Sequence, residues 1–135
     1  MNDVALATSE QKAGLSELRR AVLTLHKAML DAEKIHYERA HGRIESSMQF
    51  LALLQTDPFF AWLRPLTSLI IRFDEEVEGK EPLTAASAKT LREDAIRLLN
   101  PDQNGGEFQR NYDRVIQASP DVLILHAKVE RMLAI

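Results

Sequence analysis

Apolar residues recur along the first part of the chain at the spacing of an α-helix. They follow one another at intervals of three and four residues, at Leu15, Leu18, Val22, Leu25, Met29 and Ala32. This spacing places them in one stripe along a helix, as in the packed seam of a helical bundle. No segment alternates polar residues with β-branched apolar ones, as a half-buried strand does. The pattern therefore predicts an all-α fold.

The first predicted helix is long compared with the molecule. It begins at Thr8 or Ser9, and its stripe resumes, shifted in phase, at Tyr37, Ala40, Ile44, Met48 and Leu51. A straight helix over residues 10–55 would be about 68 Å long. A globule of this size is only about 37 Å across. The helix therefore either breaks near Gly42, within residues 38–46, or overhangs and needs a second subunit to cover its stripe.

Capping residues and prolines predict where the later helices begin. Asp57-Pro58 and Ser119-Pro120 each combine a capping side chain with a proline in the first turn. Pro65 begins another helix after a short turn, because proline is not tolerated deep inside a helix. A further helix begins at Thr84 or Ser87, either of which can cap it.

The chain is predicted to form a single domain over residues 1–135. Residues 1–8 are expected to be disordered, and residues 100–106, which include two adjacent glycines, are expected to form a loop. The expected fold is an irregular helical bundle of about five or six helices with a long, kinked first helix.

Composition and charge narrow the classes of function. The 135 residues include 17 basic and 20 acidic side chains, which gives a formal net charge of −3. This balance lacks the excess of Lys and Arg that non-specific nucleic-acid binding needs, so no nucleic-acid partner is expected. The chain has no Cys, which excludes disulfides, thiolate metal sites and cysteine nucleophiles.

Targeting and membrane segments are not expected. The N-terminus lacks the basic and apolar regions of a secretory signal. The longest apolar-leaning run, residues 63–73, contains two arginines and a proline. It is also far shorter than the roughly 20 apolar residues that cross a bilayer. We therefore expect a cytoplasmic protein with no membrane partner.

Four side chains are candidate metal ligands. Glu33 and His36 form an E-x-x-H motif, and residues three apart lie on one helix face, where both can reach one ion. On a helical wheel His26 lies at the border of the apolar arc formed by the first stripe. His126 lies on the flank of the apolar arc of the last helix. The ions considered are iron, manganese and zinc, as in di-iron bundles. The alternative is that these groups hydrogen-bond locally or face solvent. We favour it, because such motifs often arise by chance, and we expect no cofactor.

The segment over residues 59–66 is rich in aromatic residues and has two interpretations. Phe59, Trp62 and Arg64 belong to the residue types enriched at interface hot spots, which predicts a surface that docks a partner. Alternatively, Phe60, Trp62 and Leu66 anchor the corner between two helices. We favour the second interpretation, because aromatic side chains usually dominate cores.

Residues 57–66 match the pattern D-P-x-F-x-W-L-x-P-L, and further shared features are Leu25-His26-Lys27, Leu69, Ile70, Phe73, Ser119-Pro120-Asp121-Val122 and His126. In these segments the chain resembles a group of small, uncharacterised, all-helical bacterial proteins. The resemblance covers most of the chain. It implies a bacterial, cytoplasmic, helical domain and brings with it no biochemical role and no functional residue.

Two hypotheses of function follow. The first is a non-enzymatic helical domain that acts through protein contacts or self-association, with a homodimer expected. Its interface would include residues of the first stripe: Leu15, Leu18, Val22 or Leu25. The alternative is a metal- or small-ligand-binding bundle, similar to ferritin-like or hemerythrin-like proteins only in general architecture. No catalytic residues are predicted, because the sequence has no nucleophile-elbow motif.

Overall fold

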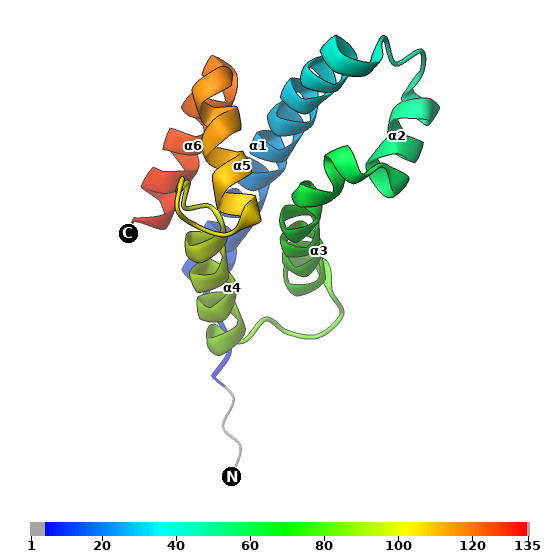
Figure 1. The fold of residues 1–135 in the computed structure, drawn as a ribbon. Helices are drawn as coiled ribbons and strands as arrows, with labels where there is room; N and C mark the ends of the chain where they lie inside the picture. The colour runs from blue at the N-terminus through cyan, green and yellow to red at the C-terminus, as the bar shows by residue number, and fades with distance from the viewer. Residues whose placement is uncertain (1–4, 135) are drawn as a thin grey trace.

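The computed structural model describes residues 5–134, and over these residues the chain is helical throughout with short connections (Figure 1). The elements are α1 (Ser9–His41), α2 (Ser47–Thr56), the 3-10 helix η1 (Pro58–Leu63), α3 (Arg64–Glu78), α4 (Ala85–Leu98), α5 (Glu107–Ala118) and α6 (Pro120–Leu133). The helix α1 contacts α3, α4, α5 and α6. The predicted all-α bundle, with six α-helices in the described part of the chain, is confirmed.

The two ends of α1 have clear local causes. At its start the Thr8 hydroxyl accepts a hydrogen bond from the Gln11 backbone N–H, and the Gln11 side chain accepts one from the Thr8 N–H. This reciprocal capping box satisfies two N–H groups that the helix itself leaves unpaired. At its end Gly42 adopts φ 90°, a conformation that favours glycine. The break predicted within residues 38–46 is therefore confirmed at Gly42.

The apolar stripe of α1 forms the centre of the core. Leu18, Val22 and Leu25 are buried beneath α3, α4 and α6 of the same chain. The predicted continuation of the stripe into residues 48–51 is wrong, since Met48 is 82% exposed and Leu51 is also exposed. The reason is that the chain reverses at residues 42–46, so α2 begins with a new phase and turns other side chains toward the protein.

The corner between α2 and α3 follows the predicted signals. The Asp57 carboxylate accepts a hydrogen bond from the Phe59 N–H at 2.9 Å, and Pro58 occupies the first turn of η1. Pro65 lies in the first turn of α3, where a missing N–H costs nothing. Phe60 lies against Phe50 of α2, with their ring centroids 5.7 Å apart. This contact holds α2 against the corner.

Of residues 1–8, for which disorder is predicted, residues 5–8 lie in the described part of the chain, and this segment pairs with a distant one. The Ala7 N–H donates to the Leu83 carbonyl, and the Ala85 N–H donates to the Ala5 carbonyl, each at 2.9 Å. These bonds pair the segment with the connection before α4 in a single β-bridge between Leu6 and Thr84. Residues 1–4 lie outside the described part of the chain.

In the C-terminal half, α4 and α6 begin where the capping residues predict. Thr84 and Ser119 each accept a hydrogen bond from a backbone N–H in the first turn of α4 and α6. A loop connects α4 to α5 over residues 100–106, as expected from its composition. The buried face of α5 consists of Phe108, Tyr112, Val115 and Ile116. In Figure 1 this half lies on one side of α1, and α2 lies at the other.

Gly14 provides a test of local helix energetics. It lies inside α1, and a Cβ built on it would meet no atom within 4 Å. Gly14→Ala is therefore expected to raise the free energy of unfolding by about 0.5–1 kcal/mol, because alanine loses less backbone entropy on folding. Urea denaturation measures the change. Gly79→Ala is the matched control and is expected to destabilise, since its Cβ would collide with the Glu75 carbonyl oxygen.

Candidate functional site

Glu33 is a buried carboxylate that joins three elements. It lies on α1 and is 1% exposed. Arg114 of α5 donates to both of its oxygens, from Nη1 to Oε1 at 3.1 Å and from Nη2 to Oε2 at 3.0 Å. The indole Nε1 of Trp62 in η1 donates to Oε2 at 2.9 Å. His36 Nδ1 lies 3.4 Å from Oε1.

This arrangement accounts for the burial of a charged group. A carboxylate out of water is costly unless it is paired and hydrogen-bonded, and here both oxygens have strong donors. The Arg114 guanidinium also lies 5.9 Å from the Trp62 ring centroid, so the cation stacks on the indole. Arg114 lies 81 positions from Glu33, and no local pattern identifies it as the partner.

A second buried polar chain runs from α5 to α6. Tyr112 Oη lies 2.6 Å from His126 Nδ1, and His126 Nε2 lies 3.0 Å from Glu130 Oε2. Burial raises the pKa of Tyr112 well above its usual value, and the nearby Glu130 carboxylate raises it further. The Tyr112 hydroxyl therefore remains protonated within this hydrogen bond.

The geometry of this chain has the order of a carboxylate, a base and a hydroxyl, but it is closed to substrates. Tyr112 is fully buried, and His126 is buried beside it, with ring centroids 5.3 Å apart. In an active site the substrate must be able to approach the nucleophile or base to hydrogen-bonding distance. We therefore interpret the Tyr112–His126 pair as a contact that fixes α6 against α5.

The structure separates the four predicted metal ligands. Glu33 and His36 are neighbours, whereas His26 on α1 lies beside Thr67 of α3, with Nε2 and Oγ1 3.4 Å apart. His126 is bonded to Tyr112 and Glu130. Across residues 5–134, no group of three or more His, Asp or Glu side chains is arranged to hold a metal ion. The four candidates thus belong to three separate clusters.

His26 gives the fold a dependence on pH. Burial lowers the pKa of His26 below its ordinary value of 6.5. As the pH falls through that value the unfolded chain binds more protons than the folded one, so the free energy of unfolding decreases. His26→Gln, which cannot titrate, is expected to lose less stability than the wild-type chain between about pH 7.5 and about pH 5. Urea titrations at both values measure this difference, and equal losses would contradict it.

The predicted partner-docking residues are divided between core and surface. Trp62 is buried and bonded to Glu33, so it is a core anchor, as are Phe60 and Leu66. Phe59 is half-buried between other aromatic rings. Arg64 is exposed and donates to the Gln55 carbonyl at 3.4 Å. The alternative that we favoured from the sequence, a corner anchored by aromatic residues, describes this segment.

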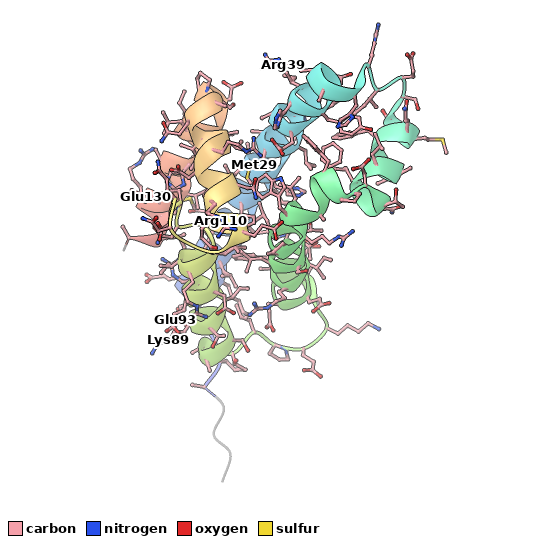
Figure 2. All side chains as sticks on the ribbon, viewed as in Figure 1. Met29, Arg39, Lys89, Glu93, Arg110 and Glu130 are labelled. Atoms are coloured by element: carbon pink, nitrogen blue, oxygen red, sulfur yellow. The ribbon has the colours of Figure 1, made fainter. Side chains whose placement is uncertain are left out.

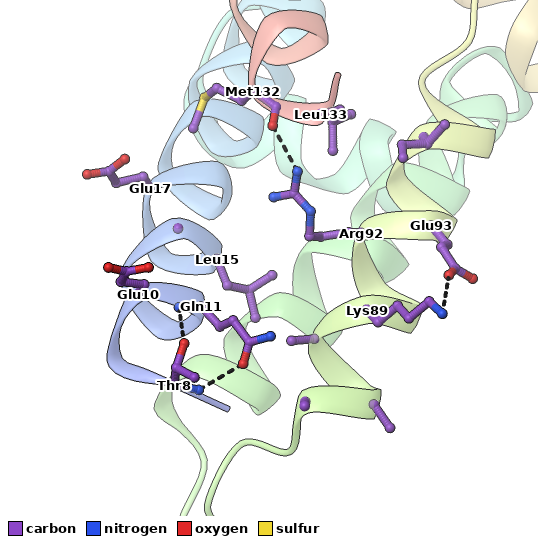
Figure 3. A pocket seen from close by; sticks show the side chains of 15 residues that line it. Thr8, Glu10, Gln11, Leu15, Glu17, Lys89, Arg92, Glu93, Met132 and Leu133 are labelled. Carbon is purple, nitrogen blue, oxygen red and sulfur yellow. Dashed lines mark hydrogen bonds and ion pairs between the residues drawn. The ribbon is translucent and has the colours of Figure 1, made fainter. Parts of the chain in front are cut away.

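An open groove lies between the start of α1, the length of α4 and the end of α6 (Figure 3). It has a volume of about 960 Å³. The residues that line it are Thr8, Glu10, Gln11, Gly14, Leu15, Glu17, Ala85, Ala86, Ala88, Lys89, Arg92, Glu93, Ile96, Met132 and Leu133. Sequence reasoning missed the groove because its residues come from three distant segments.

The groove has an apolar interior and charged edges. Small residues along α4 and Gly14 on α1 leave the space open, and Ile96 is 47% exposed within it. Arg92 crosses one end and donates to the Met132 carbonyl at 2.9 Å, which caps α6. In Figure 3 Lys89 and Glu93 stand on the α4 edge, opposite the carboxylates of α1. Figure 2 shows these two side chains projecting outward, whereas Met29 lies inside.

The predicted dimer interface on the first stripe is wrong. Leu15, Leu18, Val22 and Leu25 are each at most 1% exposed within a single chain. They are covered by α3, α4 and α6. No second subunit is needed to bury them, so any self-association uses another surface.

No protein-family model matches the chain, and no curated protein or solved structure is significantly similar to it. Across residues 5–134, no helix combines the length and apolar character needed to span a bilayer.

Proposed function

We propose that the chain is a non-enzymatic helical domain that acts through protein contacts made at the groove between α1, α4 and α6. The observation that carries this proposal is the apolar interior of the groove, with Ile96 exposed inside it. Following the resemblance of residues 57–66, we place this activity in a bacterial cytoplasm.

The apolar interior of the groove is costly to hydrate. Apolar surface in a concave site gains free energy when a partner's side chains replace the water, at about 25 cal/mol per Å² buried. Two helices, α1 and α4, form its long walls, and a groove of this kind suits a third helix whose apolar side chains cover the interior. The charged edges then orient the partner, because rim charges contribute more to orientation and partner choice than to affinity.

A photo-crosslinking experiment tests the proposal. Ile96 is replaced by a photoreactive phenylalanine derivative, and the variant is irradiated both as purified protein and in the cells that produce it. We expect a covalent adduct with a specific protein, identified by mass spectrometry. The control places the same group at Leu123, which is exposed on α6 and does not line the groove. Absence of any adduct at Ile96, or equal adducts at both positions, would contradict the proposal.

A further inference from the structure

One face of α4 carries residues whose spacing is symmetric along the helix. Ala86, Lys89, Glu93 and Ile96 are spaced by three, four and three residues, so they lie along one face of the helix. All four are exposed and line the groove. We call these four residues the α4 face.

The α4 face is complementary to itself when two copies run antiparallel. Leu91 is the midpoint between Lys89 and Glu93, and it is also the midpoint between Ala86 and Ile96. A two-fold axis at the level of Leu91 therefore brings each Lys89 opposite Glu93 of the second copy. The same axis brings each small Ala86 opposite the larger Ile96 of the second copy. An isologous dimer requires self-complementarity of this kind.

We propose that the occupant of this surface is a second copy of the chain, with the two α4 helices packed antiparallel about Leu91. This inference rests on the proposed function, since it names the partner that binds at the same groove. Within one chain Lys89 Nζ lies 3.9 Å from the Glu93 carboxylate, at the outer limit of an ion pair, and both side chains are exposed. Each charge is therefore free to turn toward an opposite charge on another molecule.

The chemistry of the contact predicts a reversible dimer. Four charges meet as two pairs of opposite sign, and two isoleucines each cover an alanine, so like charges are not forced together along α4. Exposed ion pairs contribute modestly, and such charges govern specificity and register more than affinity. The dimer therefore depends on opposite charges at positions 89 and 93 of the two copies, and like charges there oppose it.

A charge-exchange experiment tests this arrangement. In Lys89→Glu every α4–α4 contact opposes two carboxylates, and in Glu93→Lys every contact opposes two ammonium groups. Each variant alone is expected to self-associate at least about tenfold more weakly than the wild-type chain, because like charges across an interface are repulsive. Mixed in equal amounts, the two variants regain opposite charges in both pairs. Sedimentation velocity and native mass spectrometry are expected to show a heterodimer.

Controls separate this result from a loss of folding or a general charge effect. The double variant K89E/E93K exchanges both charges and is expected to recover the wild-type dimer. The pair Lys27 and Asp31 on α1 has the same i,i+4 spacing and is also exposed, so Lys27→Glu is expected to leave self-association unchanged. Failure of the mixed variants to associate, or of the double variant to recover, would overturn the antiparallel pairing.

This experiment also distinguishes failure of the inference from failure of the proposed function. A wild-type chain that stays monomeric at the highest concentration reached, yet forms an adduct from Ile96 with a different protein, overturns the self-pairing and leaves the groove as a protein-binding site. A monomeric chain without any adduct overturns both. An adduct at twice the mass of the chain supports both.

Discussion

Replacing Arg114 with methionine is expected to lower the free energy of unfolding by about 3–5 kcal/mol, because it removes one partner of a buried ion pair. Glu33 is 1% exposed, and without Arg114 its negative charge retains only the Trp62 indole and His36 beside it. Methionine preserves most of the apolar length of the arginine stem, so the loss reports the charge interaction. Urea denaturation with coincident circular dichroism and fluorescence transitions measures it.

Replacing the other partner of the pair, Glu33, is expected to lower the free energy of unfolding by less. In Glu33→Gln the amide oxygen still accepts from Trp62, and the Arg114 side chain, at 39% exposure, can be hydrated. A loss of about 1–2 kcal/mol is expected for this variant, since no charge is left buried. The double variant E33Q/R114M is expected to be more stable than R114M alone, because the two groups interact directly. Equal losses for the two single variants would contradict this account of the pair.

Local signals were sufficient to predict most helix boundaries. A capping side chain and a proline act within one turn, so Asp57-Pro58 and Ser119-Pro120 identify the starts of η1 and α6 without reference to the rest of the fold. Gly42 likewise ends α1 through its own backbone conformation. Each of these interactions involves residues close in sequence, which is why the pattern of the chain contains them.

Contacts between distant segments were not predictable in the same way. The N-terminal segment that includes residues 5–8 makes hydrogen bonds to the connection before α4, more than 70 positions away. The phase of α2 depends on how the chain reverses after Gly42, and a helix-period pattern carries no information on that turn. Both features therefore depend on tertiary contacts.

The candidate sites show the same division. The E-x-x-H spacing correctly placed Glu33 and His36 side by side, because three residues along a helix determine that distance. The spacing did not reveal that the partner of Glu33 is an arginine on α5. An apolar stripe also indicates which residues will be buried, but it does not indicate which segment packs on them. The first stripe is covered within the chain, whereas the more polar α4 face is exposed.

Replacing Phe60 with alanine is expected to release α2 and to lower the free energy of unfolding by about 3–5 kcal/mol, the usual cost of deleting a buried phenylalanine side chain. Phe60 is almost fully buried, and its ring meets those of Tyr37, Phe50 and Phe59 at centroid distances of 5.3, 5.7 and 5.0 Å. None of the side chains of α2 is itself buried. Phe50, Leu53 and Leu54 are partly buried against the core, and the Phe60 ring is the fully buried side of this contact.

Amide hydrogen exchange shows which helix the Phe60→Ala substitution destabilises. Amides of α2 are expected to lose protection first in Phe60→Ala, while those of α1 between Leu18 and Met29 keep theirs until global unfolding, because regions with few buried contacts open locally. Met48→Ala is the matched control on the same helix, since Met48 is exposed and its removal is expected to change stability by less than about 0.5 kcal/mol. If Phe60→Ala leaves the exchange of α2 unchanged, the helix is held by contacts other than this cluster.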